Sequence, residues 1–227
     1  MPPHESFSTP LSLPVAANRR QWLRNGLALS AGGVLGLIGA LHGGPAHAGA
    51  QKEEDLVDSV RTALSAAIAN HAPPVPAFRD RKSHLDYAYW LTTMSARIGN
   101  RMVDELARQE FLQTLWYEAA RAGLEVSLVL GLVQVESNFR KYAISPAGAR
   151  GLMQVMPFWA RVIGDGDAGK LFHMQTNLRF GCVILRHYLY RENGDLYMAL
   201  GRYNGSRGRP QYPNAVFAAQ KKWLLPQ

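Results

Sequence analysis

The stretch VSLVLGLVQVESN, residues 126–138, is much more apolar than the segments that flank it. A helix that is apolar on nearly all sides belongs in the core of a protein. Within it, Glu136 follows Val129 by seven residues and Val133 by three, so the carboxylate shares their face of the helix. The stretch therefore predicts a buried helix that carries one carboxylate on its core-facing side.

The position of Glu136 predicts a carboxyl group with a raised pKa. Burial disfavours the charged form of a carboxylate, and the last turn of a helix, where Glu136 lies, is the negative end of the helix dipole. A carboxylic acid that keeps its proton near neutral pH is what a general acid needs in order to protonate a leaving oxygen. The alternative is a structural glutamate held ionised by a buried arginine, for which Arg150 is the candidate.

The chain beyond residue 48 reads as helical throughout, without an alternating strand pattern or an internal repeat. A proline-rich run at 71–76 interrupts it as a linker, and Gly123 is a natural helix end. The sequence therefore predicts an all-α fold. We expect helices at 53–70, 85–98, 101–122, 126–138, 152–163, 176–192, 196–201 and 213–225, with a turn at 164–169.

The first 48 residues have the order of an export signal. Arg19 and Arg20 precede an apolar stretch at 26–41, which ends in small residues at Ala46 and Ala48. The paired arginines resemble a twin-arginine signal; a general secretory signal and an uncleaved anchor are the alternatives. No cysteine lies near the cleavage site, which excludes a bacterial lipoprotein. We therefore expect an exported, periplasmic protein that is cleaved after Ala48.

Composition excludes several classes of protein and of binding site. The 227 residues, 47% of them hydrophobic and 19% charged, fit a globular chain. The single cysteine, Cys182, excludes an intrachain disulfide and a cysteine-based zinc cluster, and His173 and His187 lack partners at metal-ligand spacing. The net charge of +8 suits an anionic partner such as cell wall, membrane or nucleic acid, or serves solubility alone. No nucleic-acid recognition motif accompanies this charge.

Beyond the core helix, four short blocks follow one another along the chain: Glu136-Ser137, Gly151-Leu152-Met153-Gln154, Ala199 with Tyr203-Asn204, and Tyr212. Together they resemble the soluble lytic transglycosylase family, whose fold is similar to that of goose-type lysozyme. The third block departs from the family pattern, because its glycine falls one place early, at Gly205. The resemblance covers residues 111–223, roughly half of the chain, and includes the helical stretch 177–181.

The resemblance implies a reaction and its acid. Members of the family cleave the β-1,4 bond between N-acetylmuramic acid and N-acetylglucosamine in peptidoglycan and leave a 1,6-anhydromuramic end. Ordinary glycosidases use two carboxylates, whereas this family uses one glutamate, which here corresponds to Glu136. That glutamate first protonates the glycosidic oxygen and then takes the proton of the 6-hydroxyl, while the N-acetyl group of the substrate stabilises the cation. Asp165, Asp167 and Asp195 lie in turn-like segments and are expected to be structural.

The resemblance also implies a set of residues around the acid. Gly151 and Gln154 are expected along the sugar cleft. Met153 either forms an apolar wall of that cleft or fills the core. The predicted site consists of the catalytic Glu136 and of substrate-binding residues Ser137, Gly151, Met153, Gln154, Tyr203, Asn204 and Tyr212.

The later blocks place polar groups beside the acid. Tyr203 offers a ring face and Asn204 an amide, although Asn204-Gly205 is also a turn dipeptide. Tyr212 is expected to hydrogen-bond near the acid or the substrate. Ser137 either orients local groups or caps the helix.

These observations predict an all-α, lysozyme-like lytic transglycosylase fold with an extra N-terminal helical segment. We divide the chain into a signal peptide at 1–48, a helical extension at 49–100 and a catalytic domain at 101–227. The expected partner is the peptidoglycan glycan strand and not nucleic acid, and a secretion or conjugation machine is a second partner class. We expect a monomer that uses no metal and no cofactor.

Two other functions fit the same sequence. One is a hydrolytic muramidase on the same fold, in which water is the attacking group. The other is a peptidoglycan-binding scaffold without catalysis, against which the intact Glu136 and Gln154 argue. The basic stretch 202–209 either contacts wall polymer or is a solvated loop.

Overall fold

A computed structural model describes residues 51–53, 56, 58–69, 76 and 78–225, all within one compact unit of the chain. These residues confirm the all-α prediction, since their extended pairings are limited to two isolated bridges. No helix among them is long and apolar enough to cross a bilayer. The predicted signal peptide lies outside the described residues. The helices are α1 (Asp58–Ala69), α2 (Arg81–Ile98), α3 (Glu105–Arg121), α4 (Val126–Ser137), α5 (Pro157–Ile163), α6 (Met174–Arg191), α7 (Leu196–Tyr203) and α8 (Gln211–Lys221), and η1 (Ala168–Phe172) is a 3₁₀ helix.

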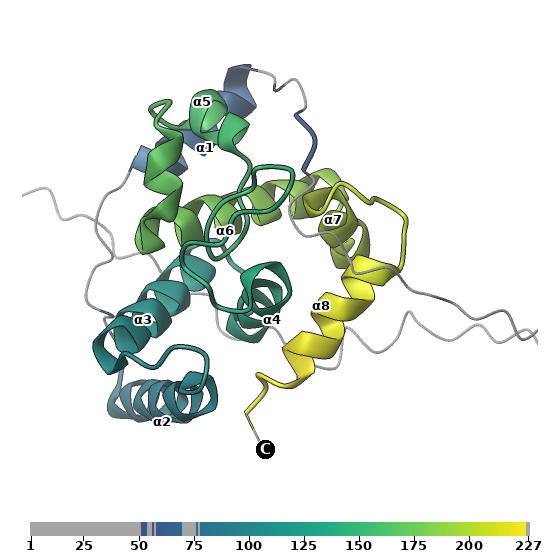
Figure 1. Cartoon of the computed structure of the whole chain (residues 1–227). Helices are drawn as coiled ribbons and strands as arrows, with labels where there is room; N and C mark the ends of the chain where they lie inside the picture. Colours follow the sequence, from purple (N-terminus) through teal and green to yellow (C-terminus); the bar gives the residue numbers. More distant parts are fainter. Residues whose placement is uncertain (1–50, 54–55, 57, 70–75, 77, 226–227) are drawn as a thin grey trace, which may run out of the picture. The chain divides into compact units, whose positions relative to one another are not determined.

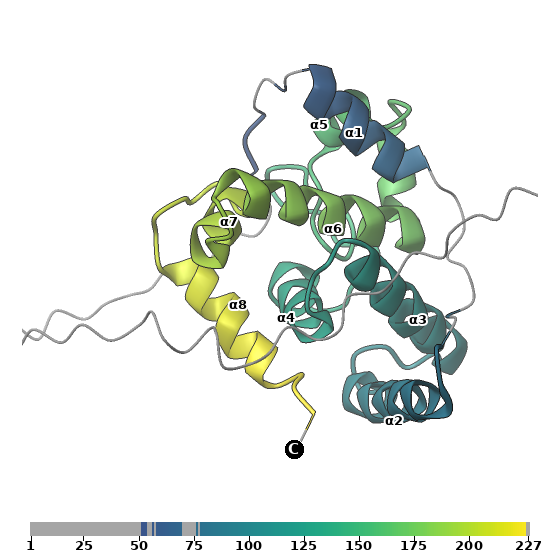
Figure 2. The same cartoon turned by 180° about the vertical axis from the view of Figure 1, so that it is seen from behind.

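Helix α4 is the core helix that the sequence predicts, and it lies between α3 and α8 (Figures 1 and 2). Helix α8 approaches it closely at Gly131, where an added Cβ atom would lie only 2.7 Å from the backbone nitrogen of Gln220. Near the end of α4, the indole Nε1 of Trp223 donates a hydrogen bond to Gln134 Oε1 at 2.9 Å. The fully buried side chains of α4 are those of Val129, Leu130, Leu132 and Val133.

At three places the residues at a helix start give a boundary that differs from the predicted one. The helix expected from residue 101 begins at Glu105, because the Asp104 carboxylate accepts the Leu106 backbone N–H at 2.9 Å. The helix expected at 152–163 begins only at Pro157, whose missing N–H suits the first helical position. The turn expected at 164–169 contains the start of η1, which Asp167 caps. The other predicted helices are present with shifted ends.

The N-terminal extension packs on the rest of the unit through α1 and α2. Helix α1 contacts α5 and α6, and α2 contacts α3. The last carbonyls of α1, at Ala67 and Ile68, accept hydrogen bonds from Arg121 and Arg179. Both arginines also pair with the buried Glu118, at 3.2 and 2.9 Å. Because cations are favourable at the negative end of a helix, this cluster holds the C-terminal end of α1 against α3 and α6.

The close approach of α4 and α8 generates a stability prediction. Gly131→Ala should lower the free energy of unfolding by about 1–3 kcal/mol, because the new methyl group would overlap the backbone of α8. Gly99→Ala is the matched control, since a Cβ atom there meets Ala96 O at 3.5 Å and the backbone φ is −47°. Urea denaturation of both variants checks this. Equal effects of the two substitutions would contradict the packing argument.

Candidate active site

Glu136 lies in the last turn of α4 and is 5% exposed. Its Oε1 accepts a hydrogen bond from the Tyr212 hydroxyl, and its Oε2 is buried with no hydrogen-bond partner among the described residues. Burial raises the pKa of Glu136 from 4.5 to about 8, and the Tyr212 hydrogen bond acts in the opposite direction. Glu136 therefore holds a proton near neutral pH, as a general acid must.

Tyr212 reaches Glu136 from the first turn of α8 and is itself 1% exposed. Burial raises the pKa of its hydroxyl well above the ordinary value, and the charge of Glu136 adds to this effect. The hydroxyl therefore remains a hydrogen-bond donor at any pH at which the protein functions. The hydrogen bond that the sequence led us to expect for Tyr212 is present in the structure.

Arg150 does not hold Glu136 ionised. Its Nη1 donates to the carbonyl oxygen of Ala168 at 2.8 Å, and its guanidinium carbon lies 5.5 Å from the ring centre of Phe172. Within the described part of the chain, Glu136 forms no ion pair. The geometry favours a buried acid over a structural glutamate.

The loop at 151–154 is held in place by the carboxamide of Asn177 on α6. Its Nδ2 donates to Arg150 O at 2.8 Å and to Leu171 O at 2.7 Å, and its Oδ1 accepts the Met153 N–H at 2.8 Å. Gly151 allows this close contact, because its φ is +77° and a Cβ atom there would lie 2.4 Å from Asn177 Nδ2. Asn177 belongs to the helical stretch 177–181 that the family resemblance includes, but the sequence alone indicates no role for it.

Two hydroxyl groups bind the same loop from other helices. Ser137 Oγ donates to Leu152 O at 2.8 Å and Tyr203 Oη donates to Met153 O at 2.8 Å. Gln154 Nε2 closes the loop by donating to Gly151 O at 2.9 Å. Ser137 and Tyr203 are buried, so in this structure they position the loop beneath the acid. This fits the expectation that Ser137 orients local groups.

Met153 and Asn204 have structural environments. The Met153 side chain is fully buried against Gly181, where a Cβ atom would lie 2.3 Å from the Met153 sulfur. This placement favours the core alternative for Met153. Asn204 ends α7 and donates to Ser206 Oγ at 3.0 Å, and Gly205 follows with a φ of +73°. The Asn-Gly turn is therefore present, and Asn204 Oδ1 is buried with no partner among the described residues.

Gln51 is a residue near the site that sequence reasoning missed. It is 4% exposed, and its Oε1 accepts the Met156 N–H at 3.3 Å, two residues beyond the loop. Burial raises the pKa of the Tyr203 hydroxyl well above its ordinary value, and the neighbouring Gln51 side chain opposes this rise. Gln51 lies in the N-terminal extension, outside all four sequence blocks, so no motif could have identified it.

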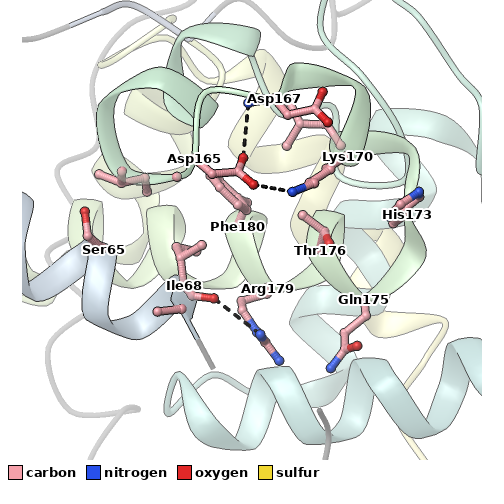
Figure 3. Close-up of a pocket in the computed structure, with 14 residues that line it drawn as sticks. Ser65, Ile68, Asp165, Asp167, Lys170, His173, Gln175, Thr176, Arg179 and Phe180 are labelled. Carbon is pink, nitrogen blue, oxygen red and sulfur yellow. Dashed lines mark hydrogen bonds and ion pairs between the residues drawn. The ribbon is translucent and has the colours of Figure 1, made fainter. Parts of the chain in front are cut away.

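A pocket of about 610 Å³ lies between α1, the α5–η1 connection and α6, and Figure 3 shows its polar lining. Glu136 does not line this pocket. Asp165 pairs with Lys170, and Asp167 Oδ1 accepts the Gly169 N–H at 2.8 Å. Outside the pocket, Asp195 caps α7. The three aspartates therefore have the structural roles that the sequence predicts.

The basic stretch 202–209 is partly neutralised within the fold, since one carboxylate, that of Glu192, pairs with two of its three arginines. Glu192 Oε1 lies 2.6 Å from Arg202 Nη2 and 2.8 Å from Arg207 Nε. These contacts lower the pKa of Glu192 from 4.5 to about 2, and the hydrogen bond from Arg207 has the largest effect. Arg202 and Arg207 are therefore bound to the protein itself, which favours a structural role for these two arginines over contact with wall polymer.

The described residues hold no group of three His, Cys, Asp or Glu side chains that could bind a metal ion. His173 is exposed at the start of α6. Cys182 is fully buried, and burial raises the pKa of its thiol well above the ordinary value. Neither residue has the surroundings of a reactive group.

Residues 114–225 match the family model described as "Transglycosylase SLT domain". Membrane-bound lytic murein transglycosylase C of Actinobacillus pleuropneumoniae is 39% identical over 104 residues, which are 43% of this chain and 26% of that protein. The protein of the same name from Haemophilus ducreyi is 45% identical over 119 residues, 46% of this chain and 32% of that one.

A solved structure of the lytic transglycosylase Slt from Pseudomonas aeruginosa is 23% identical, with a TM-score of 0.45. The match covers 62% of this chain and 29% of that chain. The chain thus spans less than a third of the length of the two curated relatives, 26% and 32%.

The Asn177 contacts predict a large stability effect. Asn177→Ala should lower the free energy of unfolding by about 3 kcal/mol or more, because two buried backbone groups and one partly buried one lose their partners. Asn214→Ala, at an exposed position of α8, is the control and should have little effect. Chemical denaturation measures both. Equal losses would show that the carboxamide does not hold the loop.

The raised pKa of Glu136 predicts how stability depends on pH. The unfolded chain loses this proton near pH 4.5 and the folded chain near pH 8, so wild-type stability should fall between these two values. Glu136→Gln removes the effect and should stabilise the protein near pH 7 by about 3 kcal/mol. Melting temperatures across this pH range test it, with Glu110→Gln at an exposed site as control. Destabilisation by Glu136→Gln throughout the range would refute the buried-acid argument.

Proposed function

Residues 114–225 belong to the soluble lytic transglycosylase family, and from that membership we propose that the chain cleaves the glycan strands of peptidoglycan. The observation that carries this proposal is Glu136, a buried carboxyl group with a pKa of about 8 beside a rigidly held loop. A protonated acid in such a place can protonate the oxygen of a glycosidic bond. The proposed bond is the β-1,4 linkage between N-acetylmuramic acid and N-acetylglucosamine.

In the proposed reaction Glu136 acts first as acid and then as base. It gives its proton to the bridging oxygen, and the bond from that oxygen to muramic C1 breaks. The N-acetyl group of the substrate stabilises the cation at C1. The ionised Glu136 then takes the proton of the 6-hydroxyl, whose oxygen bonds to C1. Glu136 regains its proton, no water is consumed, and the products are a free 4-hydroxyl and a 1,6-anhydromuramic end.

The Tyr212 hydrogen bond supports this cycle. Because the Tyr212 hydroxyl donates to Oε1, the acidic proton of Glu136 belongs on Oε2, the oxygen with no partner among the described residues. After proton transfer the same hydrogen bond becomes charge-assisted and stabilises the carboxylate. A single glutamate is thereby stabilised in both of the states that the reaction requires.

We also propose that the chain acts in the periplasm, where peptidoglycan is found. The order of basic, apolar and small residues in the first 48 positions supports export. Both wall turnover and local wall opening for an envelope-spanning machine would use this reaction. The proposed partner is the glycan strand, and the proposed state is a monomer.

Product analysis tests the proposed function. Purified peptidoglycan treated with the protein should release muropeptides with 1,6-anhydro ends, identified by mass spectrometry. Glu136→Gln should lower the rate by about 100- to 10,000-fold, because general acid catalysis contributes about that much. Activity should fall as the pH rises through about 8, where Glu136 loses its proton.

The controls separate the alternatives. Glu110→Gln changes an exposed glutamate of α3 and should leave the rate unchanged. Reducing ends that carry one more water would identify a hydrolytic muramidase. Binding to the polymer without any released product would identify a scaffold, and near wild-type rates of Glu136→Gln would remove Glu136 as the acid.

A further inference from the structure

The loop that leads from α4 to residue 154 is strongly basic. Between Ser137 and Gln154 the sequence contains Arg140, Lys141 and Arg150 but no acidic residue. Among the described residues none of the three cations forms an ion pair. This loop therefore presents positive charge without an acidic partner, in contrast to Arg202 and Arg207, which pair with Glu192.

Two aromatic side chains lie among these cations, Tyr142 and Phe172, and we call this pair the aromatic rim. Their ring centres are 6.2 Å apart, and Tyr142 is 70% exposed. Lys141 Nζ lies 5.4 Å from the Tyr142 ring centre, and the Arg150 guanidinium lies 5.5 Å from that of Phe172. Exposed aromatic surface flanked by polar groups is typical of a binding surface.

The aromatic rim is attached to the candidate active site through its backbone neighbours. Ala143 O, next to Tyr142, accepts the Gly151 N–H at 2.9 Å and Gln154 Nε2 at 3.1 Å. Leu171 O, next to Phe172, accepts Asn177 Nδ2 at 2.7 Å. The same hydrogen bonds that position the loop beside the acid therefore also fix the backbone that carries both rings.

We propose that the aromatic rim is a substrate subsite of the proposed peptidoglycan-cleaving activity, and this inference rests on that function. A sugar ring of the glycan strand packs its apolar C–H face on Tyr142. Lys141 attracts a carboxylate of the peptide stem that the muramic residue carries. The rim thus binds the strand beyond the bond that Glu136 cleaves.

Binding is measured in the Glu136→Gln background, so that the polymer is not consumed. Cosedimentation with insoluble peptidoglycan should show that adding Tyr142→Ala weakens binding about two- to tenfold, the range expected for loss of an aromatic contact. Tyr142→Phe keeps the ring and should bind as well as the parent. Tyr190→Ala is the matched control, since Tyr190 is 81% exposed on α6 and outside the rim.

A second polymer distinguishes the proposed contact of Tyr142 with the sugar from that of Lys141 with the peptide stem. On glycan strands from which an amidase has removed the peptide stems, Tyr142→Ala should still weaken binding, whereas Lys141→Ala should weaken binding only to intact peptidoglycan. In the active enzyme, Tyr142→Ala should raise KM and leave kcat nearly unchanged, as expected for lost binding that is uniform along the reaction.

The results distinguish failure of this inference from failure of the proposed function. If Tyr142→Ala matches Tyr190→Ala on both polymers while wild type still releases anhydro ends, the rim is not a subsite and the function stands. If Tyr142→Ala changes only the oligomeric state, the rim is a contact between copies and the inference is wrong. If wild type releases no product, the proposed function fails and the subsite fails with it.

Discussion

The three hydrogen bonds of the Asn177 carboxamide are the constraint on which the candidate site depends. A carboxamide has two N–H donors and one acceptor oxygen, and Asn177 uses all of them on backbone groups of Arg150, Met153 and Leu171. Because the residue is 1% exposed, water cannot replace any of these partners. These bonds therefore fix the loop to helix α6, which carries Asn177, and the close approach of the two requires the positive φ of Gly151.

The polar groups around the site fall into two classes. The loop carbonyls are satisfied by Ser137, Tyr203 and Asn177, each from a different helix. Glu136 Oε2 and Asn204 Oδ1 form the second class, since both are buried with no partner among the described residues, and Tyr212 satisfies only the other carboxyl oxygen of Glu136. A buried charge without a partner costs stability, so the unpartnered Oε2 favours the protonated form of Glu136, in line with its raised pKa.

The sequence predicts those features that depend on local periodicity. Glu136 was placed on a buried helix face because 3.6-residue spacing and apolar neighbours are readable from the chain, and its raised pKa follows from that burial. Helix ends were less predictable, since single capping groups such as Asp104 and Pro157 decide them. Asn177 and Gln51 could not be assigned roles, because their partners Met153 and Met156 lie 24 and 105 residues away in the chain.

The distribution of charge over the fold is also only partly predictable from the sequence. The net charge of +8 is readable from composition, but its location is not. Glu192 pairs with both Arg202 and Arg207 through contacts that only the fold creates, so its single negative charge offsets part of the charge of the stretch that looks most basic in the sequence. The loop containing Lys141 keeps its charge because none of its cations forms an ion pair within the part of the chain that the structure describes. A positive loop close in sequence to the candidate acid would raise the local concentration of an anionic polymer. Glu136 keeps its proton near neutral pH because it is buried, and the effect of burial on its pKa outweighs that of the Tyr212 hydrogen bond.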